Sequence, residues 1–463
     1  MSAAEPALVD VAVIGGGVVG CAVARELAGF DVSVALIEAR GDVGDATSKA
    51  NTAILHTGFD AVPGSLEARL VARGYALLGD YAKATRIPVE GTGAVLVAWT
   101  DEERGSLESL RQKAIANGYL DCEILASEAV YALVPHLGPG VLAGLTVPGE
   151  SIICPWTTTL AYATEALARG ATLMLGTRVT GVSVADDVTT LATTRGLVRA
   201  RWVVNAAGMG ADVIDRMYGF DRFTVVPRRG ELIVFDKQAR PLADCIVLPV
   251  PSSRGKGVLV SPTIYGNVML GPTSENLADR EDTSTTAAGM EFLLGKGRAI
   301  MPSLLEEEVT AAYAGLRAAT EHGDYVVDVD ADRRYLLIGG IRSTGLTASM
   351  ALAEHAGLQL AGAGLALAPR VGLPPVPVLP NIGEAFPRPY QRADLIESDP
   401  EYGAIVCFCE RVTRGEIRDA LRSPIPPCDV DGLRRRTRAT MGRCQGFACG
   451  ADVESALHAT DLA

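Results

Sequence analysis

The sequence is poor in aromatic residues and has no extended basic region. Phe, Trp and Tyr make up 5% of its 463 residues, and the formal net charge is −13. Because proteins hold nucleic acid with a surface rich in Lys and Arg, this balance argues against nucleic acid as a partner. The one short basic run comprises Arg434–Arg436 and Arg438. We expect it to form a solvated face, with a docking patch as the alternative.

Neither a membrane span nor a secretory leader is visible in the sequence. The first residues lead directly into a strand pattern, without the basic and apolar segments of a signal peptide. The least polar stretch, residues 356–369, contains glycines and is shorter than the roughly 20 residues that cross a bilayer. We therefore expect a cytoplasmic protein with no direct membrane span, which would reach the inner membrane only through a partner.

The cysteines are too unevenly distributed for a disulfide framework. There are nine of them, an odd number, and five lie between Cys407 and Cys449 while the other four are scattered. This distribution favours a metal site in a reducing compartment.

The N-terminal residues have the pattern of a dinucleotide-binding unit. An apolar run, residues 8–14, leads into Gly15-x-Gly17-x-x-Gly20, a helical pattern follows, and a second apolar run ends at Glu38. Strand, helix and strand in this order favour a parallel crossover. Glycines at such a turn let the backbone approach a pyrophosphate at the helix N-terminus, and the acidic residue can accept hydrogen bonds from ribose hydroxyls. We expect a dinucleotide here, with a tight structural turn as the alternative.

Two later segments favour FAD over NAD. Residues 203–208 close a strand with small side chains, and residues 339–345 form a second glycine-rich junction between a strand and a helix. A second helix N-terminus fits the long FAD molecule, whose flavin needs its own anchor. The cofactor contacts that we expect are Gly15, Gly17, Gly20, Glu38, Ser48, Asn51, Ala207, Gly208, Gly340, Gly345, Leu346 and Thr347.

Six short motifs are spread over most of residues 1–370, namely 51–58 (NTAILHTG), 228–231 (RRGE), 255–258 (GKGV), 266–267 with 271–272 (GN and GP), 313–317 (YAGLR) and 340–348 (GIRSTGLTA). As a set they resemble the D-amino-acid-oxidase-like superfamily of flavoproteins, in the branch of glycerol-3-phosphate dehydrogenase/oxidase and L-2-hydroxyglutarate dehydrogenase. The resemblance implies that His56 lies beside the flavin, as base or substrate contact. It also implies that Lys256, Arg317 and Arg342 face the anionic end of the substrate.

The residue types in this set suit the oxidation of an alcohol. Removing hydride from a carbinol requires a base for the hydroxyl proton, and His titrates in the useful range. The planar fork of Arg binds two oxygens of a carboxylate or phosphate, and Lys acts as a point charge. A hydrogen-bonded structural histidine and surface salt bridges are the alternative interpretations of these residues.

Four of the C-terminal cysteines have the spacing of metal ligands. Cys407-x-Cys409 precedes Cys444-x4-Cys449, and Cys428 lies between the pairs without a partner at such spacing. Four thiolates suit Zn²⁺ or an iron–sulfur cluster. The pattern resembles the bacterioferritin-associated-ferredoxin-like [2Fe-2S] domain, which is also fused behind the flavin part of anaerobic glycerol-3-phosphate dehydrogenase and of some amine dehydrogenases. The resemblance implies a [2Fe-2S] cluster on these four cysteines, with zinc as the alternative.

Together these patterns predict an α/β protein. We expect a Rossmann-like FAD-binding domain with an inserted α+β substrate domain that contains a mixed or antiparallel sheet, followed by a small helical [2Fe-2S] domain. The FAD-binding domain is discontinuous and comprises residues 1–90, 151–224 and 321–371, the substrate domain comprises 91–150 and 225–320, a Pro-rich linker covers 372–400, and the [2Fe-2S] domain covers 401–463. Because the linker separates the units, we expect loss of the cluster to leave FAD bound.

A flavin that accepts a hydride beside a one-electron cluster predicts a dehydrogenase. The expected substrate is a small anionic hydroxylated molecule, either a polyol phosphate similar to glycerol 3-phosphate or a 2-hydroxy acid. The expected electron acceptor is a quinone or a redox partner subunit. One alternative is an amine or imino-acid dehydrogenase, in which His56 is dispensable. The other is a non-catalytic electron-transfer subunit, against which the intact glycine pattern argues.

Overall fold

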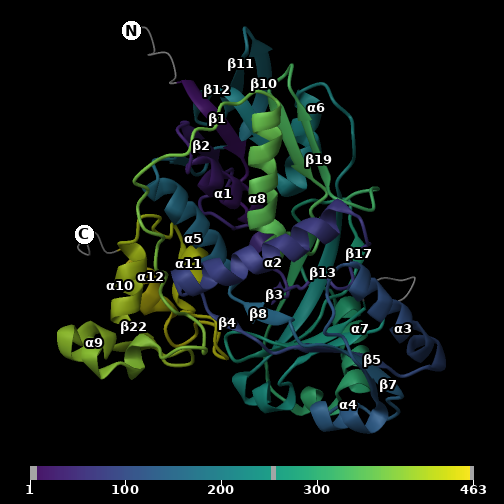
Figure 1. Ribbon diagram of the computed structural model, residues 1–463. Helices are drawn as coiled ribbons and strands as arrows, with labels where there is room; N and C mark the ends of the chain where they lie inside the picture. The colour runs from purple at the N-terminus through teal and green to yellow at the C-terminus, as the bar shows by residue number, and fades with distance from the viewer. Residues whose placement is uncertain (1–7, 252–256, 459–463) are drawn as a thin grey trace.

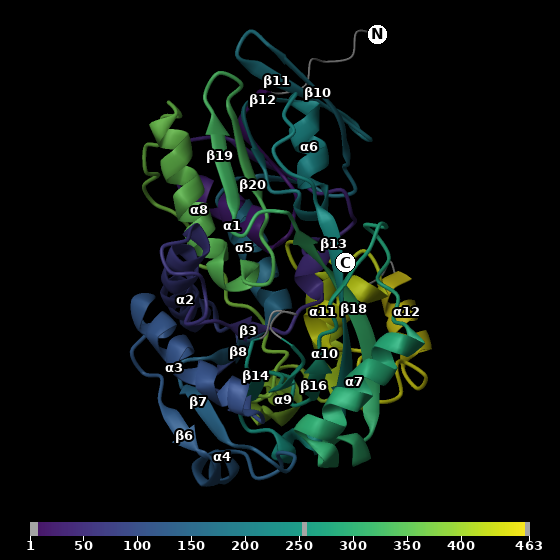
Figure 2. The same ribbon diagram turned by 90° about the vertical axis from the view of Figure 1, so that its right-hand side faces the viewer.

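The chain is built on two large sheets and a small C-terminal unit (Figure 1). A computed structural model describes residues 8–251 and 257–458. Figure 2 shows helices α3, α4 and α7 around the end of the molecule that lies farthest from the first sheet. None of the helices in these described ranges combines the length and the hydropathy that crossing a bilayer requires.

The first sheet contains the dinucleotide-binding pattern. Its strand order is β10-β11-β12-β1-β2-β9, and β20 also pairs with β12 and carries β19 at its other edge. The strands are β1 (Leu8–Ile14), β2 (Val34–Ile37), β9 (Thr172–Met174), β10 (Val179–Ala185), β11 (Val188–Thr193), β12 (Gly196–Asn205), β19 (Val326–Asp330) and β20 (Tyr335–Gly339). The pairs among β9, β2, β1, β12 and β20 are parallel. Their carboxyl ends therefore meet at one edge of the sheet, where open α/β sheets bind ligands.

Helices cover both faces of this sheet because its strands alternate between two apolar clusters. Val11 and Val13 of β1 join the cluster of α1 (Val18–Leu27), α5 (Pro155–Ala168) and α8 (Gly345–Gly362). Ala12 and Ile14 join the cluster on the opposite face, which includes residues of α6 (Ala211–Met217). Burial on both faces is the usual state of a parallel sheet.

The second sheet is mixed, as the sequence predicts for the inserted part. Its order is β17-β13-β16-β15-β14-β5-β7-β6, and β18 pairs with β13. The strands are β5 (Ala94–Ala98), β6 (Ile124–Ala126), β7 (Ala143–Val147), β13 (Val226–Phe235), β14 (Ile246–Pro249), β15 (Leu259–Pro262), β16 (Val268–Gly271), β17 (Glu275–Asn276) and β18 (Val309–Ala319). The accompanying helices are α3 (Asp101–Ala116), α4 (Ser127–Leu133) and α7 (Ala287–Ile300). Only the pairing of β14 with β5 is parallel within the described part of this sheet.

A separate three-stranded sheet and one long helix belong to neither of the two large sheets. The small sheet has the order β3-β8-β4, with β3 (Ile54–Leu55), β8 (Ser151–Ile153) and β4 (Val89–Glu90). The helix is α2 (Leu66–Thr85). Its N-cap is Ser65, whose hydroxyl accepts a hydrogen bond from the N–H of Ala68. Side-chain caps of this kind satisfy an N–H that the helix itself leaves unpaired.

The Pro-rich segment leads from the end of α8 to the C-terminal unit, residues 401–458. The segment lies against α2, since the N–H of Leu379 donates to the carbonyl of Thr85 (3.0 Å). The last part of the segment forms α9 (Ala393–Ser398), and the C-terminal unit contains β21 (Ile405–Cys407), β22 (Val412–Thr413), α10 (Arg414–Leu421), α11 (Val430–Thr437) and α12 (Gly450–His458). In Figure 1 this unit, coloured yellow, lies beside α5.

The prediction that the basic run forms a solvated face is wrong for most of its residues. Arg435, Arg436 and Arg438 are buried, and Arg434 is partly exposed, with 38% of its side chain accessible. Asp42 accepts hydrogen bonds from Arg435 and Arg436. The run is therefore a docking patch between the C-terminal unit and the loop that follows β2.

A glycine in α2 marks its close crossing with α8. A Cβ added to Gly74 would lie 2.2 Å from the carbonyl oxygen of Thr347, whereas one added to Gly79 meets nothing within 4 Å. We expect Gly74→Ala to destabilise the fold by about 1–3 kcal/mol, the usual effect of overpacking. Gly79→Ala in the same helix should be neutral or stabilise by up to about 1 kcal/mol, since Ala favours helix. Thermal unfolding of the two variants tests this difference, and equal melting temperatures would contradict it.

Candidate functional site

A cavity of about 620 Å³ lies where the first sheet meets the second. Its lining includes the glycine turn before α1, the junction before α8, and parts of β13 and β18. Cavities of this size hold cofactors and small ligands. The position matches the carboxyl edge of the parallel strands.

The glycine turn brings the start of α1 against the sheet. Gly15 has φ +109°, and a Cβ there would lie 2.4 Å from the carbonyl oxygen of Ala206. A Cβ on Gly20 would lie 1.8 Å from the oxygen of Gly15, so helix and strand touch through backbone. A Cβ on Gly17 would meet only the hydroxyl of Ser48 at 3.2 Å. The remaining space at Gly17 faces the cavity, where the helix N-terminus favours an anion.

Glu38 closes the same end of the cavity at the end of β2. One carboxylate oxygen accepts from the N–H of Gly16 (2.6 Å) and the other from the N–H of Arg40 (2.7 Å). Burial raises the pKa of Glu38. Two backbone bonds fix the carboxylate while lone pairs remain for ribose hydroxyls, so these residues fit the pyrophosphate and ribose of FAD.

A second helix starts at the other end of the cavity. Gly340 (φ +66°), Gly345 and Leu346 line it at the junction between β20 and α8. The N-cap residue Thr344 makes no side-chain cap hydrogen bond, which leaves N–H groups of the first turn for a ligand. Helix starts at both ends of one cavity fit a long dinucleotide with anchors at both of its ends.

The structure brings most of the predicted cofactor residues together. Ten of them line the cavity, namely Gly15, Gly17, Glu38, Ser48, Asn51, Ala207, Gly208, Gly340, Gly345 and Leu346. Gly20 and Thr347 do not line it. Gly20 lies at the contact of α1 with the sheet, and the hydroxyl of Thr347 accepts from the N–H of His56 (3.0 Å).

His56 pairs with an acidic residue that the sequence analysis missed. The register of β3 with β8 sets Leu55 opposite Ser151, so His56 and Glu150 are the next opposing pair. Nδ1 of His56 lies 2.9 Å from Oε2 of Glu150. Glu150 is 0% exposed, and its other oxygen accepts from the N–H and the hydroxyl of Thr57. In the tautomer with the hydrogen on Nδ1, His56 donates to Glu150 and keeps a lone pair on Nε2.

His56 itself does not line the cavity, although residues 52–54 before it do. Its side chain is 20% exposed, and its backbone N–H donates to Thr347 in the first turn of α8. The backbone at His56 is therefore tied to the helix whose start lines the cavity.

Arg317 lines the cavity from β18 and pairs with no carboxylate of the described residues. Among the described residues its hydrogen bonds go to two backbone carbonyls, those of Thr273 (2.8 Å) and Arg229 (3.5 Å). Burial, and second to it the charge of Arg228, lowers the pKa of Arg317 to about 10. A buried cation without a counter-charge is costly, and an anionic ligand would relieve that cost.

The other two residues predicted to contact the anion are Arg342 and Lys256. Arg342 lines the cavity, but its guanidinium already donates to Glu67 (2.9 Å) and to the carbonyl of Gly323 (2.9 Å). Lys256 lies outside the described residues. Of the two arginines predicted to hold the substrate, Arg342 is thus already paired with a carboxylate, whereas Arg317 donates to backbone carbonyls.

The four cysteines with ligand spacing lie close to one another. Contacts with Cys444 act on the pKa of the Cys409 thiol, and burial, with the nearby Cys407 second to it, raises the pKa of the Cys449 thiol. A Cβ on Gly442 would lie 2.3 Å from the Cβ of Cys409, so the two cysteine loops are in direct contact. In the described ranges no three His, Cys, Asp or Glu side chains converge as ligands of a single ion. Four thiols close together fit a cluster of two irons, each of which takes two thiolates.

Comparison with known proteins agrees with both sites. The model of the FAD dependent oxidoreductase family (DAO) matches residues 10–357, and that of the BFD-like [2Fe-2S] binding domain matches residues 405–459. Glycerol 3-phosphate dehydrogenase of Caloramator mitchellensis is 34% identical over 96% of this chain and 92% of its own length. Glycerol 3-phosphate oxidase of Mycoplasma pneumoniae is 32% identical over 75% of this chain and 93% of its own.

Solved structures give the same result. L-α-glycerophosphate oxidase from Mycoplasma pneumoniae with FAD bound has a TM-score of 0.77 and 30% identity, and the match covers 81% of this chain and 100% of that one. Glycine oxidase from Geobacillus kaustophilus, at 24% identity and a TM-score of 0.70, shares the fold; that match covers 81% of this chain and 100% of that chain. The chain therefore belongs to the FAD dependent oxidoreductase family, and it is a flavoprotein oxidoreductase that carries a BFD-like [2Fe-2S] domain behind its FAD-binding part.

Proposed function

We propose that this flavoprotein is a dehydrogenase of a small anionic alcohol. The substrate is a polyol phosphate of the glycerol 3-phosphate type or a 2-hydroxy acid. Electrons leave through the [2Fe-2S] cluster to an external acceptor, a quinone or a redox partner subunit. The relatives named glycerol 3-phosphate dehydrogenase and oxidase support this substrate class.

The observation that carries the proposal is Arg317. Its guanidinium faces a cavity built for a flavin cofactor, is mostly buried, and donates only to backbone carbonyls among the described residues. A phosphate or carboxylate accepts two parallel hydrogen bonds from such a fork. An uncharged amine or alcohol would leave this charge uncompensated.

His56 and Glu150 supply the proton chemistry. Bound FAD supplies the hydride acceptor. His56 takes the hydroxyl proton of the substrate on Nε2, while Glu150 holds Nδ1–H and stabilises the imidazolium that forms. Glu150 is thus a positioning residue that acts through His56. Arg317 holds the anionic end of the substrate and thereby fixes the reacting carbon.

The cysteines support a dehydrogenase in a reducing compartment. All nine are free thiols, and four of them have the spacing of cluster ligands. Free thiols in this number are typical of cytoplasmic proteins. Cell fractionation checks the proposed location, and recovery in an oxidising compartment would contradict it.

Anaerobic reduction of the bound flavin tests the substrate class. The purified protein is mixed with glycerol 3-phosphate, glycerol, a 2-hydroxy acid, glycine and proline, and flavin absorbance is followed. We expect bleaching by an anionic alcohol at concentrations where glycerol is inert. Bleaching by the amino acids alone would overturn the proposal in favour of an amine dehydrogenase.

We expect His56→Ala to slow flavin reduction by roughly 10² to 10⁴, the usual effect of losing a placed general base. Glu150→Gln should slow it in the same direction, because an amide can donate to Nδ1 and move the hydrogen to Nε2. The double variant should be no slower than His56→Ala, since both changes remove one function. Stopped-flow absorbance measures these rates.

Thr57→Val is the matched control for Glu150, because it removes only a hydroxyl bond to the same carboxylate. It should reduce its flavin at nearly the rate of the unmodified protein. Additive losses in the His56 and Glu150 double variant would show that Glu150 acts independently of His56.

We expect Arg317→Ala to raise the KM for the anionic substrate by roughly 10- to 100-fold, the usual worth of a hydrogen bond to a charged group. Arg317→Lys should recover part of the loss, since Lys keeps the charge but not the fork. In the unmodified protein the KM should also rise above about pH 10, because Arg317 loses its proton there. A KM that is independent of pH and of both substitutions would remove Arg317 from the site.

A further inference from the structure

The loop between β2 and β3 has two sides with different neighbours. We call residues 39–51 the cofactor loop. Residues 45–51 line the FAD cavity, together with residues 39 and 40. The loop is tied to the glycine turn as well, because the N–H of Gly44 donates to the carbonyl of Gly16 (2.8 Å) and Ser48 Oγ accepts from the N–H of Val18 (2.9 Å).

Helix α11 of the C-terminal unit holds the other side of this loop. Asp42 accepts from Arg435 (2.8 Å) and from both terminal nitrogens of Arg436 (2.7 and 2.8 Å). Arg435 also pairs with Asp45 (2.9 Å), which itself lines the cavity. Two arginines of one unit thus bind two carboxylates of the loop that faces FAD.

The contact between Asp42 and the two arginines is buried, so water cannot readily take the place of either partner. Asp42 is 2% exposed and Arg436 is 5% exposed. Burial alone would raise the pKa of Asp42, but the hydrogen bonds and charges of Arg436 and Arg435 hold it below its ordinary value. Removing one partner of such a buried pair leaves an uncompensated charge, which is strongly destabilising. If α11 left, the loop would have to move Asp42 into solvent.

A second contact reaches the same loop through stacked side chains. The guanidinium of Arg438 lies 4.3 Å from the ring centre of Tyr265, which stacks on Trp156 (4.8 Å, 15°). The indole N–H of Trp156 donates to the carbonyl of Lys49 (3.0 Å), a residue of the cavity lining. Cation–π and stacked contacts of this kind are stabilising when they are desolvated.

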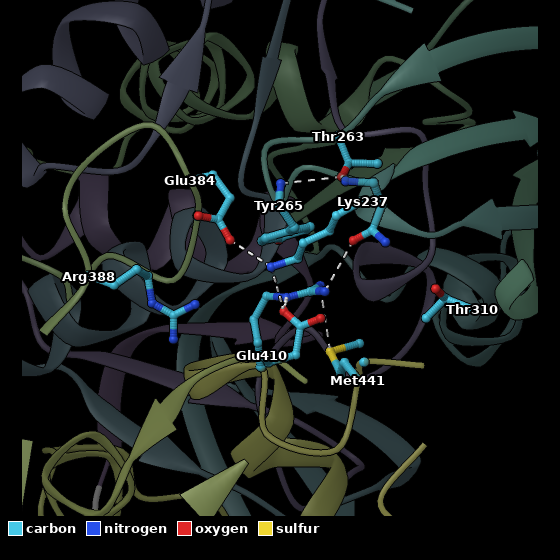
Figure 3. A network of polar contacts seen from close by, with 12 residues as sticks. Lys237, Thr263, Tyr265, Thr310, Glu384, Arg388, Glu410 and Met441 are labelled. Atoms are coloured by element: carbon cyan, nitrogen blue, oxygen red, sulfur yellow. Dashed lines mark hydrogen bonds and ion pairs between the residues drawn. The ribbon is translucent and has the colours of Figure 1, made fainter. Parts of the chain in front are cut away.

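The residue that holds Arg438 is adjacent to a cluster ligand. Nε of Arg438 lies 2.9 Å from Oε2 of Glu410, which follows Cys409. Lys237 lies 3.2 Å from the same carboxylate. Figure 3 shows Glu410 of the C-terminal unit paired with Lys237, with Met441 on the same side of the network and Thr263 and Tyr265 of the rest of the chain on the other. The cysteine loops are therefore connected to the cofactor loop through buried side chains.

We propose that Arg435 and Arg436 are positioning residues for FAD, which hold the cofactor loop in its binding conformation from the C-terminal unit. FAD affinity then depends on that unit being folded around its cysteines. By linkage, FAD binding stabilises the docked α11 by the same factor. Loss of the cluster should therefore weaken FAD binding, in contrast to the expectation from a separating Pro-rich linker.

The test measures FAD affinity of the FAD-depleted full chain by flavin fluorescence. We expect Arg436→Gln to raise the Kd for FAD by roughly 5- to 150-fold, the usual size of coupling between sites. Arg434→Gln is the matched control, because Arg434 lies on the same helix, is 38% exposed and pairs only with the neighbouring Asp431 among the described contacts. The control should leave the Kd unchanged. An Arg436→Gln protein with normal circular dichroism and an unchanged Kd would overturn the proposal, as would an equal rise in the control.

Asp42→Asn decides the question if Arg436→Gln does not fold. It removes the charge of Asp42 without changing the C-terminal unit. It should raise the Kd for FAD by the same roughly 5- to 150-fold as Arg436→Gln. Cys444→Ser, which removes a cluster ligand, should also raise the Kd for FAD. An unchanged Kd in either folded variant would overturn the proposal.

Hydrogen exchange supplies a readout that a purely structural salt bridge would not give. In the unmodified chain, FAD should slow amide exchange across residues 430–438, which do not touch the cavity. In Asp42→Asn this protection by FAD should be lost. Equal protection in both proteins would contradict the coupling.

Discussion

The unpaired N–H groups at the starts of α1 and α8 are the constraint on which the site depends. An α-helix leaves its first N–H groups without partners. Both helices begin at one cavity, and neither N-cap residue, Gly17 or Thr344, provides a side-chain cap. Among the described side chains, Ser48 of the cofactor loop accepts from the N–H of Val18. The cavity therefore requires a ligand rich in acceptors at both ends, which FAD provides.

This requirement fixes the residue types around the cavity. Backbone N–H groups reach a ligand only where no side chain intervenes, and for that reason the turn at Gly15 to Gly20 touches the sheet through backbone atoms. The groups proposed to act on the substrate come from elsewhere, His56 from the end of β3 and Arg317 from β18. Strand register, rather than a flexible loop, sets His56 opposite Glu150. Groups held in this way need little reorganisation when a substrate binds.

The sequence predicts the parts of this site that depend on local pattern. Periodicity and glycine spacing place the strands and helices around the glycine turn within a few residues, and ten of twelve predicted cofactor residues line the cavity. Strand β11 was not predicted, although Asp186 and Asp187, both at positive φ, mark its hairpin turn. Helix α7 was not predicted because three glycines interrupt its apolar pattern.

The partners of His56 and of the basic run could not be predicted, because they depend on tertiary contacts. Glu150 lies 94 positions from His56, in a short turn that resembles any polar surface turn. Asp42 lies 393 positions from Arg435. A run of arginines has the same local pattern whether it meets solvent or a buried carboxylate, and only the tertiary contact distinguishes the two.

The same contacts determine how the C-terminal unit is held. A Pro-rich segment by itself would tether a unit at a range of positions. Here the segment is pinned to the end of α2 at Leu379, and its last part carries Arg388, which is 1% exposed and bonded to Glu416 of α10. Buried charges tolerate little displacement, since a small separation leaves each without its partner and without water. The Asp42 contact adds a third fixed point, so the cysteine loops are docked on the flavin-binding part in one orientation.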